Sequence, residues 1–139
     1  MSSSLYESGI KELAATHCGP ETLSDPDRRV SVDNPFCGDR VDLEINLEAG
    51  QVTALAQKVR GCLLCQAAAN IVAQSAIGLS AAEIEAVEND LRAMLQGDDK
   101  ADWTPPGWES LALFEPVRRH KSRHGCVTLP FTALQKAVS

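Results

Sequence analysis

The chain has 139 residues, of which 44% are hydrophobic and 23% charged, and its formal net charge is −6 at pH 7. This length suffices for one domain with a buried core, and the acidic balance disfavours a general nucleic-acid binder, which needs a basic surface. No apolar run approaches the roughly 18 residues of a membrane span. The N-terminus shows no secretory signal, so a cytoplasmic location is expected.

The first half of the chain predicts one helix, one loop and two strands. Residues 5–16 have apolar side chains at helical spacing, and residues 19–33, rich in Pro, Asp and Ser, predict a loop. After turn residues at 34–39, residues 41–47 alternate strictly between apolar and polar side chains, which indicates a half-buried strand. A tight connection leads to a second strand at 52–59, so the two strands are expected to form an antiparallel hairpin.

The second half predicts four helical segments, at 62–77, 80–95, about 108–114 and about 126–138. Ser80 and Glu83 form a capping-box pattern at the start of the second segment. Residues 97–107 are polar and broken by prolines, and they predict an insert. The order of elements indicates an α+β domain over residues 1–139, with an antiparallel sheet of about three strands and helices packed on one face.

Three of the five cysteines stand where a thiol can act as a ligand. Cys37 and Asp39 flank a glycine in a turn before the first strand, where a relaxed backbone can aim both side chains at one point. Cys62 opens a helix, whose N-terminus favours a thiolate. Cys126 opens the last helix behind the basic stretch 118–124, whose positive charge acts in the same direction.

Three thiolates and a carboxylate can complete a tetrahedral zinc shell, and the same thiolates can hold an iron–sulfur cluster. The cysteines are far apart in the sequence and do not follow a zinc-finger spacing. Residue type alone therefore leaves scattered structural cysteines as an equal alternative.

Residues 34–39 have the sequence Asn-Pro-Phe-Cys-Gly-Asp, Cys62 follows a glycine after the hairpin, and Cys126 begins a Cys-Val-Thr-Leu segment behind Arg123. Together these segments resemble the three cysteine motifs of U-type iron–sulfur cluster assembly proteins, the family of the NifU N-terminal domain, IscU and SufU. The insert, and Gly125 in place of the histidine found in the IscU type, make the chain most similar to the SufU type.

The resemblance implies a zinc-binding protein, with Cys37, Asp39, Cys62 and Cys126 as ligands, that accepts persulfide sulfur from a pyridoxal-phosphate cysteine desulfurase. Cys37 is the first candidate acceptor and Cys126 the second, with Arg123 assisting, so any enzymatic activity would be at most that of a sulfurtransferase. A role as scaffold for a [2Fe–2S] cluster, passed to apo iron–sulfur proteins or cluster carriers, is the alternative that the resemblance leaves open. No nucleic-acid or membrane partner is expected.

Cys65 stands where the family usually has a serine, and this departure opens further alternatives. Cys62 and Cys65 form a Cys-x-x-Cys pattern between a strand and a helix, which would also suit a thioredoxin-like dithiol oxidoreductase. A purely structural zinc site is a third hypothesis. In the metal site, Cys65 is expected to support the ligands rather than to replace Asp39 as the fourth ligand. His124 is expected to be a solvated member of the basic stretch rather than a ligand, and Cys18 a buried small hydrophobe.

Overall fold

The computed structural model describes residues 8–15, 19–35, 38–98, 103 and 107–139. In chain order the elements are α1 (Ser8–Ala15), β1 (Arg28–Asp33), β2 (Arg40–Glu48), β3 (Gln51–Arg60), α2 (Leu63–Ser75), α3 (Ala81–Leu95), the 3-10 helices η2 (Glu109–Arg119) and η3 (Lys121–Arg123), and α4 (His124–Val138). Within the described residues, no helix is long and apolar enough to cross a membrane. Cys18 and most of the predicted insert lie outside the described residues.

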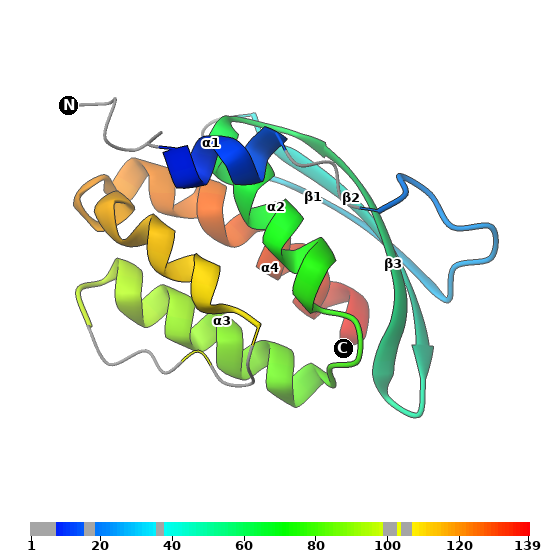
Figure 1. The fold of residues 1–139 in the computed structure, drawn as a ribbon. Coiled ribbons are helices and arrows are strands. Elements are labelled where there is room, and N and C mark those ends of the chain that lie inside the picture. Colours follow the sequence, from blue (N-terminus) through cyan, green and yellow to red (C-terminus); the bar gives the residue numbers. More distant parts are fainter. Residues whose placement is uncertain (1–7, 16–18, 36–37, 99–102, 104–106) are drawn as a thin grey trace.

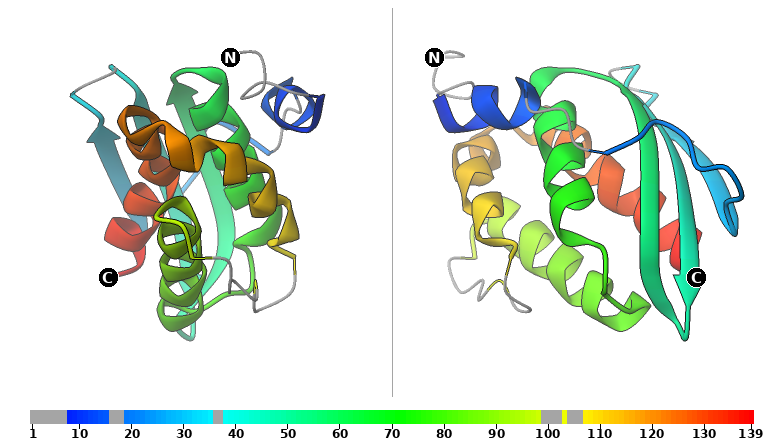
Figure 2. Two further views of the ribbon diagram at one scale, coloured as in Figure 1. Left: turned by 90° about the vertical axis from the view of Figure 1, so that its left-hand side faces the viewer. Right: turned by 45° about the vertical axis from the view of Figure 1, so that its right-hand side comes forward.

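The three strands form one antiparallel sheet in the order β1-β2-β3, and the helices all lie on one side of it (Figure 1). The predicted α+β architecture is therefore confirmed. Helices α2 and α4 pack directly on the sheet, and α1, α3 and η2 pack on these two helices from outside (Figure 2). The inward side chains of β2, Val41, Leu43 and Ile45, are completely buried, as the alternating pattern predicts.

The edge strand β1 corrects the prediction of a loop over residues 19–33, because residues 28–33 pair along the whole of their length with β2. Only two apolar side chains of this strand, Val30 and Val32, turn toward the core, and both are half-buried. Two alternating apolar residues in a polar segment give a weak strand pattern. The strand forms because β2 offers it a complete hydrogen-bonding edge.

One end of the sheet, which we call the hairpin end, consists of the β2–β3 turn and the α2–α3 connection, residues 49–50 and 76–80. Ala49 and Gly50 have φ values of 54° and 79°, the positive pair that a two-residue type I′ turn requires. The α2–α3 connection returns to the start of β3, where the Val52 N–H donates to the Leu79 carbonyl at 3.0 Å. The Ser80–Glu83 capping box is present in both directions and confirms the predicted start of α3.

The second tryptophan of the chain anchors η2 to the domain. Trp108 is completely buried, and its ring lies 5.7 Å from that of Phe131 in α4. Its bulk therefore serves packing rather than a surface contact. The short helix predicted near residues 108–114 is a 3-10 helix that continues to Arg119.

Candidate metal centre

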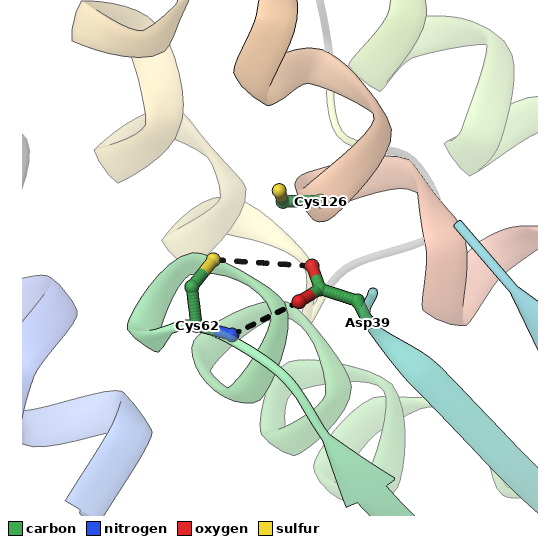
Figure 3. A group of neighbouring side chains, drawn as sticks. All are labelled: Asp39, Cys62 and Cys126. Carbon is green, nitrogen blue, oxygen red and sulfur yellow. Dashed lines mark hydrogen bonds between the residues drawn. The ribbon is translucent and has the colours of Figure 1, made fainter. Parts of the chain in front are cut away.

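The register of the β2–β3 hairpin brings two of the predicted ligands together. Arg40 pairs with Arg60, so Asp39 before β2 and Cys62 after β3 lie at the same end of the sheet. The Cys62 backbone N–H donates to Asp39 Oδ1 at 3.2 Å, and the Cys62 Sγ lies 3.9 Å from Asp39 Oδ2 (Figure 3). Asp39 is only 3% exposed. Its carboxylate is therefore held beside Cys62 and largely out of contact with water.

The third predicted ligand comes from the first turn of α4, which packs against β1, β2 and α2. Cys126 is completely buried, and the ligand atoms of Asp39, Cys62 and Cys126 all lie within 4.8 Å of one another. In Figure 3 the three side chains approach one another from β2, the start of α2 and α4. Cys37, the fourth predicted ligand, lies outside the described residues. We call this end of the sheet, with residues 39, 61–62 and 124–126, the site end.

Gly61 leaves room for the carboxylate. A Cβ on this residue would lie 2.9 Å from Asp39 Oδ1 and 2.9 Å from the Cys65 Cβ. Real Cβ atoms essentially never come this close to other heavy atoms, so any larger residue at this position would push Asp39 or Cys65 away. The glycine is needed here for space, between the Asp39 carboxylate and the first turn of α2.

Asn34 and Gly125 form a second close contact that sequence reasoning did not anticipate. A Cβ on Gly125 would lie 2.7 Å from Asn34 Nδ2. Asn34 is itself buried, and its N–H donates to the Asp39 carbonyl at 2.8 Å. The first residue of the Asn-Pro motif therefore binds the Asp39 backbone and lies directly against the start of the helix that carries Cys126. The motif itself was the only signal that could have pointed to Asn34.

The surroundings of Cys62 favour its thiolate. The Cys126 thiol, followed by the backbone N–H groups of Cys65 and Leu64, lowers the pKa of Cys62 from its ordinary value of 9.0 to about 6. Burial of Cys62 and the charge of the Asp39 carboxylate raise this pKa, but their effect is smaller than the lowering by the hydrogen bonds. As a thiol Cys62 donates to Asp39, and as a thiolate it accepts from Cys126 and from the start of α2.

The donor set fits a tetrahedral metal ion. Tetrahedral ligands about 2.0–2.3 Å from a zinc ion lie about 3.3–3.8 Å from one another, and the observed Sγ–Oδ2 separation between Cys62 and Asp39 is 3.9 Å. Two sulfurs and a carboxylate are donors that zinc accepts readily, and thiolates also suit iron–sulfur chemistry. Without a cation, a buried carboxylate beside a thiolate would be electrostatically unfavourable.

The remaining candidates do not join this group. Cys65 is completely buried and next to Gly61, but it is not one of the three residues whose ligand atoms converge. His124 is half-buried, and its Nε2 donates to the carbonyls of Val117 and Arg118 at 3.1 and 3.2 Å. It is not the solvated residue that we expected, because its Nε2 satisfies carbonyls at the end of η2, and it is not one of the three residues whose ligand atoms converge.

Arg123 stands at the N-cap of α4, one turn before Cys126, and is half-buried. Its neighbour in the basic stretch, Arg118, is engaged elsewhere, since its Nε donates to the Met94 carbonyl at 3.2 Å. The Arg118 Nη1 also lies 3.5 Å from Glu115 Oε1, so this guanidinium is occupied at the end of α3 and within η2. The predicted role of Arg123 in sulfur transfer stays a prediction.

The observed fold is not that of a thioredoxin-like protein. A thioredoxin-like protein is built on βαβ units with parallel strands, whereas every strand pair in the described part of the chain is antiparallel. The Cys62–Cys65 pattern therefore belongs to a different architecture.

This architecture defines a class: small α+β domains that gather cysteines and a carboxylate at one end of an antiparallel sheet. The comparison with known families specifies it further, because residues 14–137 match the family described as the NifU-like N terminal domain. The chain therefore belongs to this family of iron–sulfur cluster assembly proteins, which confirms the resemblance found in its motifs.

Individual relatives are distant but cover most of the chain. The iron–sulfur cluster assembly scaffold protein IscU of Streptococcus pyogenes serotype M1 is 27% identical over 78% of this chain and 67% of its own length. The zinc-dependent sulfurtransferase SufU of Bacillus subtilis is 27% identical over 79% of this chain and 74% of its own. The crystal structure of a NifU-like protein (N-terminal) from Brucella abortus superposes with a TM-score of 0.90 at 28% identity, covering 99% of this chain and 94% of that one.

Proposed function

We propose that this protein binds one zinc ion and accepts persulfide sulfur from a pyridoxal-phosphate cysteine desulfurase during iron–sulfur cluster assembly. The observation that carries this proposal is the convergence of Asp39, Cys62 and Cys126 at the buried site end of the sheet. The names of two relatives support it, since one is a zinc-dependent sulfurtransferase and the other an assembly scaffold.

In this proposal Cys37, Asp39, Cys62 and Cys126 hold the metal. A bound zinc ion would keep the ligating thiols deprotonated near neutral pH. The protein contributes in the same direction through the N–H groups at the start of α2, which stabilise the Cys62 thiolate. Gly61 and Gly125 allow the segments that carry the ligands to approach one another closely. A Cβ on either glycine would meet Asp39 or Asn34 within 3 Å and would push these segments apart.

Sulfur transfer would proceed by thiolate attack on the outer sulfur of the desulfurase persulfide. A new S–S bond forms on the acceptor cysteine, the S–S bond of the donor breaks, and the donor cysteine leaves as a thiolate. Cys37 is the first candidate acceptor because it precedes Gly38 in a segment whose sequence predicts a turn, and Cys126 is the second. Cys126 is completely buried, so the site would have to open before this thiol could react. Arg123 would assist by pairing with the acceptor thiolate or by engaging Asp39.

A scaffold role uses the same residues with a different occupant. Thiolates of this set can hold a [2Fe–2S] cluster, which would be the product of assembly and would pass to an apo iron–sulfur protein or a cluster carrier. Metal analysis together with a visible absorption spectrum of anaerobically purified protein distinguishes the two roles. Zinc gives no visible absorption, whereas an iron–sulfur cluster absorbs strongly.

The experiment that tests sulfur transfer uses a cysteine desulfurase with radiolabelled cysteine and the full chain. Wild-type protein should stimulate the desulfurase and acquire label that a thiol reductant removes. Cys37→Ser should lose most of both effects, and Cys126→Ser should lose part of them. Cys18→Ser, which removes a cysteine outside the predicted ligand set, is the matched control and should behave as wild type. If the Cys37→Ser and Cys126→Ser proteins both stimulate the desulfurase normally, the mechanism is wrong.

A further inference from the structure

We propose that Cys62 and Cys65 act as a dithiol pair that reduces sulfane sulfur at this site and releases it as sulfide. The inference rests on the proposed function, because it requires that sulfur reach the site as a persulfide. The sulfur of a persulfide is two electrons more oxidised than the sulfide of an iron–sulfur cluster. A chain with two neighbouring thiols carries these two electrons itself.

The backbone brings Cys62 and Cys65 into the range of Cα separations that a disulfide spans. Cys62 is the N-cap of α2, in an extended conformation, and Cys65 is the third residue of the helix. Residues three apart in a helix have Cα atoms about 5 Å apart, inside the 4.4–6.8 Å range that a disulfide spans. Cys62 therefore stands directly before the first turn of the helix, and Cys65 lies in that turn.

The two thiols differ in exposure, and the difference assigns their roles. Cys62 is half-buried and open to a sulfur donor, whereas Cys65 is completely buried beside Gly61. Sulfur can reach Cys62 from outside or from Cys126, because the sulfurs of these two residues lie within 4.8 Å of each other. Cys65 is shielded from external reagents and is placed to react with what Cys62 carries.

The step balances without an added oxidant or metal. The Cys65 sulfur attacks the inner sulfur of the Cys62 persulfide, so a Cys62–Cys65 bond forms and the bond to the outer sulfur breaks. The two cysteine sulfurs are oxidised to a disulfide, and the outer sulfur is reduced by two electrons. The protons of the persulfide and of the Cys65 thiol leave with it as hydrogen sulfide. A thiol or dithiol reductant then restores the pair for the next cycle.

The family pattern has serine at position 65. A serine hydroxyl cannot form a disulfide with Cys62, so Cys65→Ser is the direct test. The metal-free, reduced full chain is loaded with inorganic polysulfide, desalted, and followed under anaerobic conditions without reductant. Released sulfide is measured against time, and mass spectrometry after alkylation locates persulfides and disulfides. Circular dichroism confirms that the variants are folded, and Cys65→Ala serves as a second variant.

Wild-type protein and the matched control Cys18→Ser should release one sulfide for each Cys62–Cys65 disulfide formed. Cys65→Ser and Cys65→Ala should keep the persulfide on Cys62 and release sulfide about tenfold more slowly or worse, until dithiothreitol is added. Release at the wild-type rate from either variant, or sulfide release without the disulfide, would overturn the inference. A parallel arm with a cysteine desulfurase and cysteine separates the two proposals, because failure to load from the desulfurase counts against the proposed function and leaves the polysulfide result intact.

Discussion

The two ends of the sheet use glycine for different physical reasons. At the hairpin end, Gly50 and Gly78 have φ values of 79° and 95°, and a Cβ on either would meet no atom within 4 Å. At the site end, Gly61 and Gly125 have no such backbone requirement, yet a Cβ on them would lie within 2.9 and 2.7 Å of neighbouring atoms. The first pair is required by the left-handed backbone conformation of the turns. The second pair is required by the close packing around the candidate metal centre.

The two ends of the sheet also differ in how their polar groups are paired. At the hairpin end, the capping box of Ser80 and Glu83 satisfies the start of α3 locally. At the site end, the 3%-exposed Asp39 faces two thiols, an arrangement that costs stability unless a cation is present. Departures from local consistency are expected where proteins bind or react, and the buried carboxylate beside two thiols is such a departure at the site end.

The largest expected effect is on the ionisation of Cys62. In metal-free protein its thiolate should persist down to about pH 6, where an ordinary thiol has a pKa of 9.0. The rate of Cys62 alkylation, followed by mass spectrometry from pH 4 to 10, should therefore have its midpoint near 6. Because the folded-state pKa is lowered, the stability that this group contributes is full above the unfolded-state pKa and is lost as the pH falls through 6. Cys126→Ser should move the midpoint upward, and an unchanged midpoint in that variant would contradict the assigned cause.

The next effect is on metal retention against a competing chelator. Asp39→Ala should weaken retention by about tenfold or more, because a ligand and its hydrogen bond to Cys62 are lost. Cys65→Ser should change retention little, because Cys65 is outside the converging group. The reverse ranking would make Cys65 the fourth ligand in place of Asp39.

A glycine substitution at each end sharpens the comparison. Gly61→Ala should weaken metal retention, though less than Asp39→Ala, because the new Cβ displaces the carboxylate by crowding. Gly78→Ala should leave retention unchanged and lower the free energy of unfolding by about 1–2 kcal/mol, through its positive φ. Chelator competition and thermal unfolding of the metal-free proteins measure the two quantities separately. Equal loss of metal from both variants would show that the ends are not independent.

The smallest effect concerns the cap of α3. Ser80→Ala should lower the free energy of unfolding by about 1 kcal/mol because the Glu83 N–H loses its acceptor. Denaturant unfolding of the metal-free protein measures this loss, and the variant should bind metal as tightly as wild type. A weakened metal site in this variant would break the division between the two ends.

Features with local causes were predictable from the sequence. The strict alternation of residues 41–47 predicted β2, and Ser80 with Glu83 predicted the start of α3. The β2–β3 hairpin was also predicted, and its register alone brings Asp39 to Cys62. The motif resemblance then pointed to Cys126, whose place beside Asp39 and Cys62 depends on how α4 packs.

Features that depend on distant contacts were not predictable. Strand β1 has only Val30 and Val32 on its inner face and forms because β2 provides an edge. The approach of Asn34 to Gly125 joins residues far apart in the chain and has no local pattern. His124 was misjudged for the same reason, since its carbonyl partners at the end of η2 become visible only in three dimensions.

We propose that the site end holds one metal ion through Asp39, Cys62 and Cys126, with Cys37 as the fourth ligand that the sequence motif predicts. Native mass spectrometry of the full chain, purified anaerobically, tests it most directly when combined with alkylation of the same sample. We predict a mass corresponding to one bound metal per chain, and protection of the site thiols that a chelator abolishes. A metal-free mass, with all of these thiols alkylating at the rate of an ordinary cysteine, would contradict the claim.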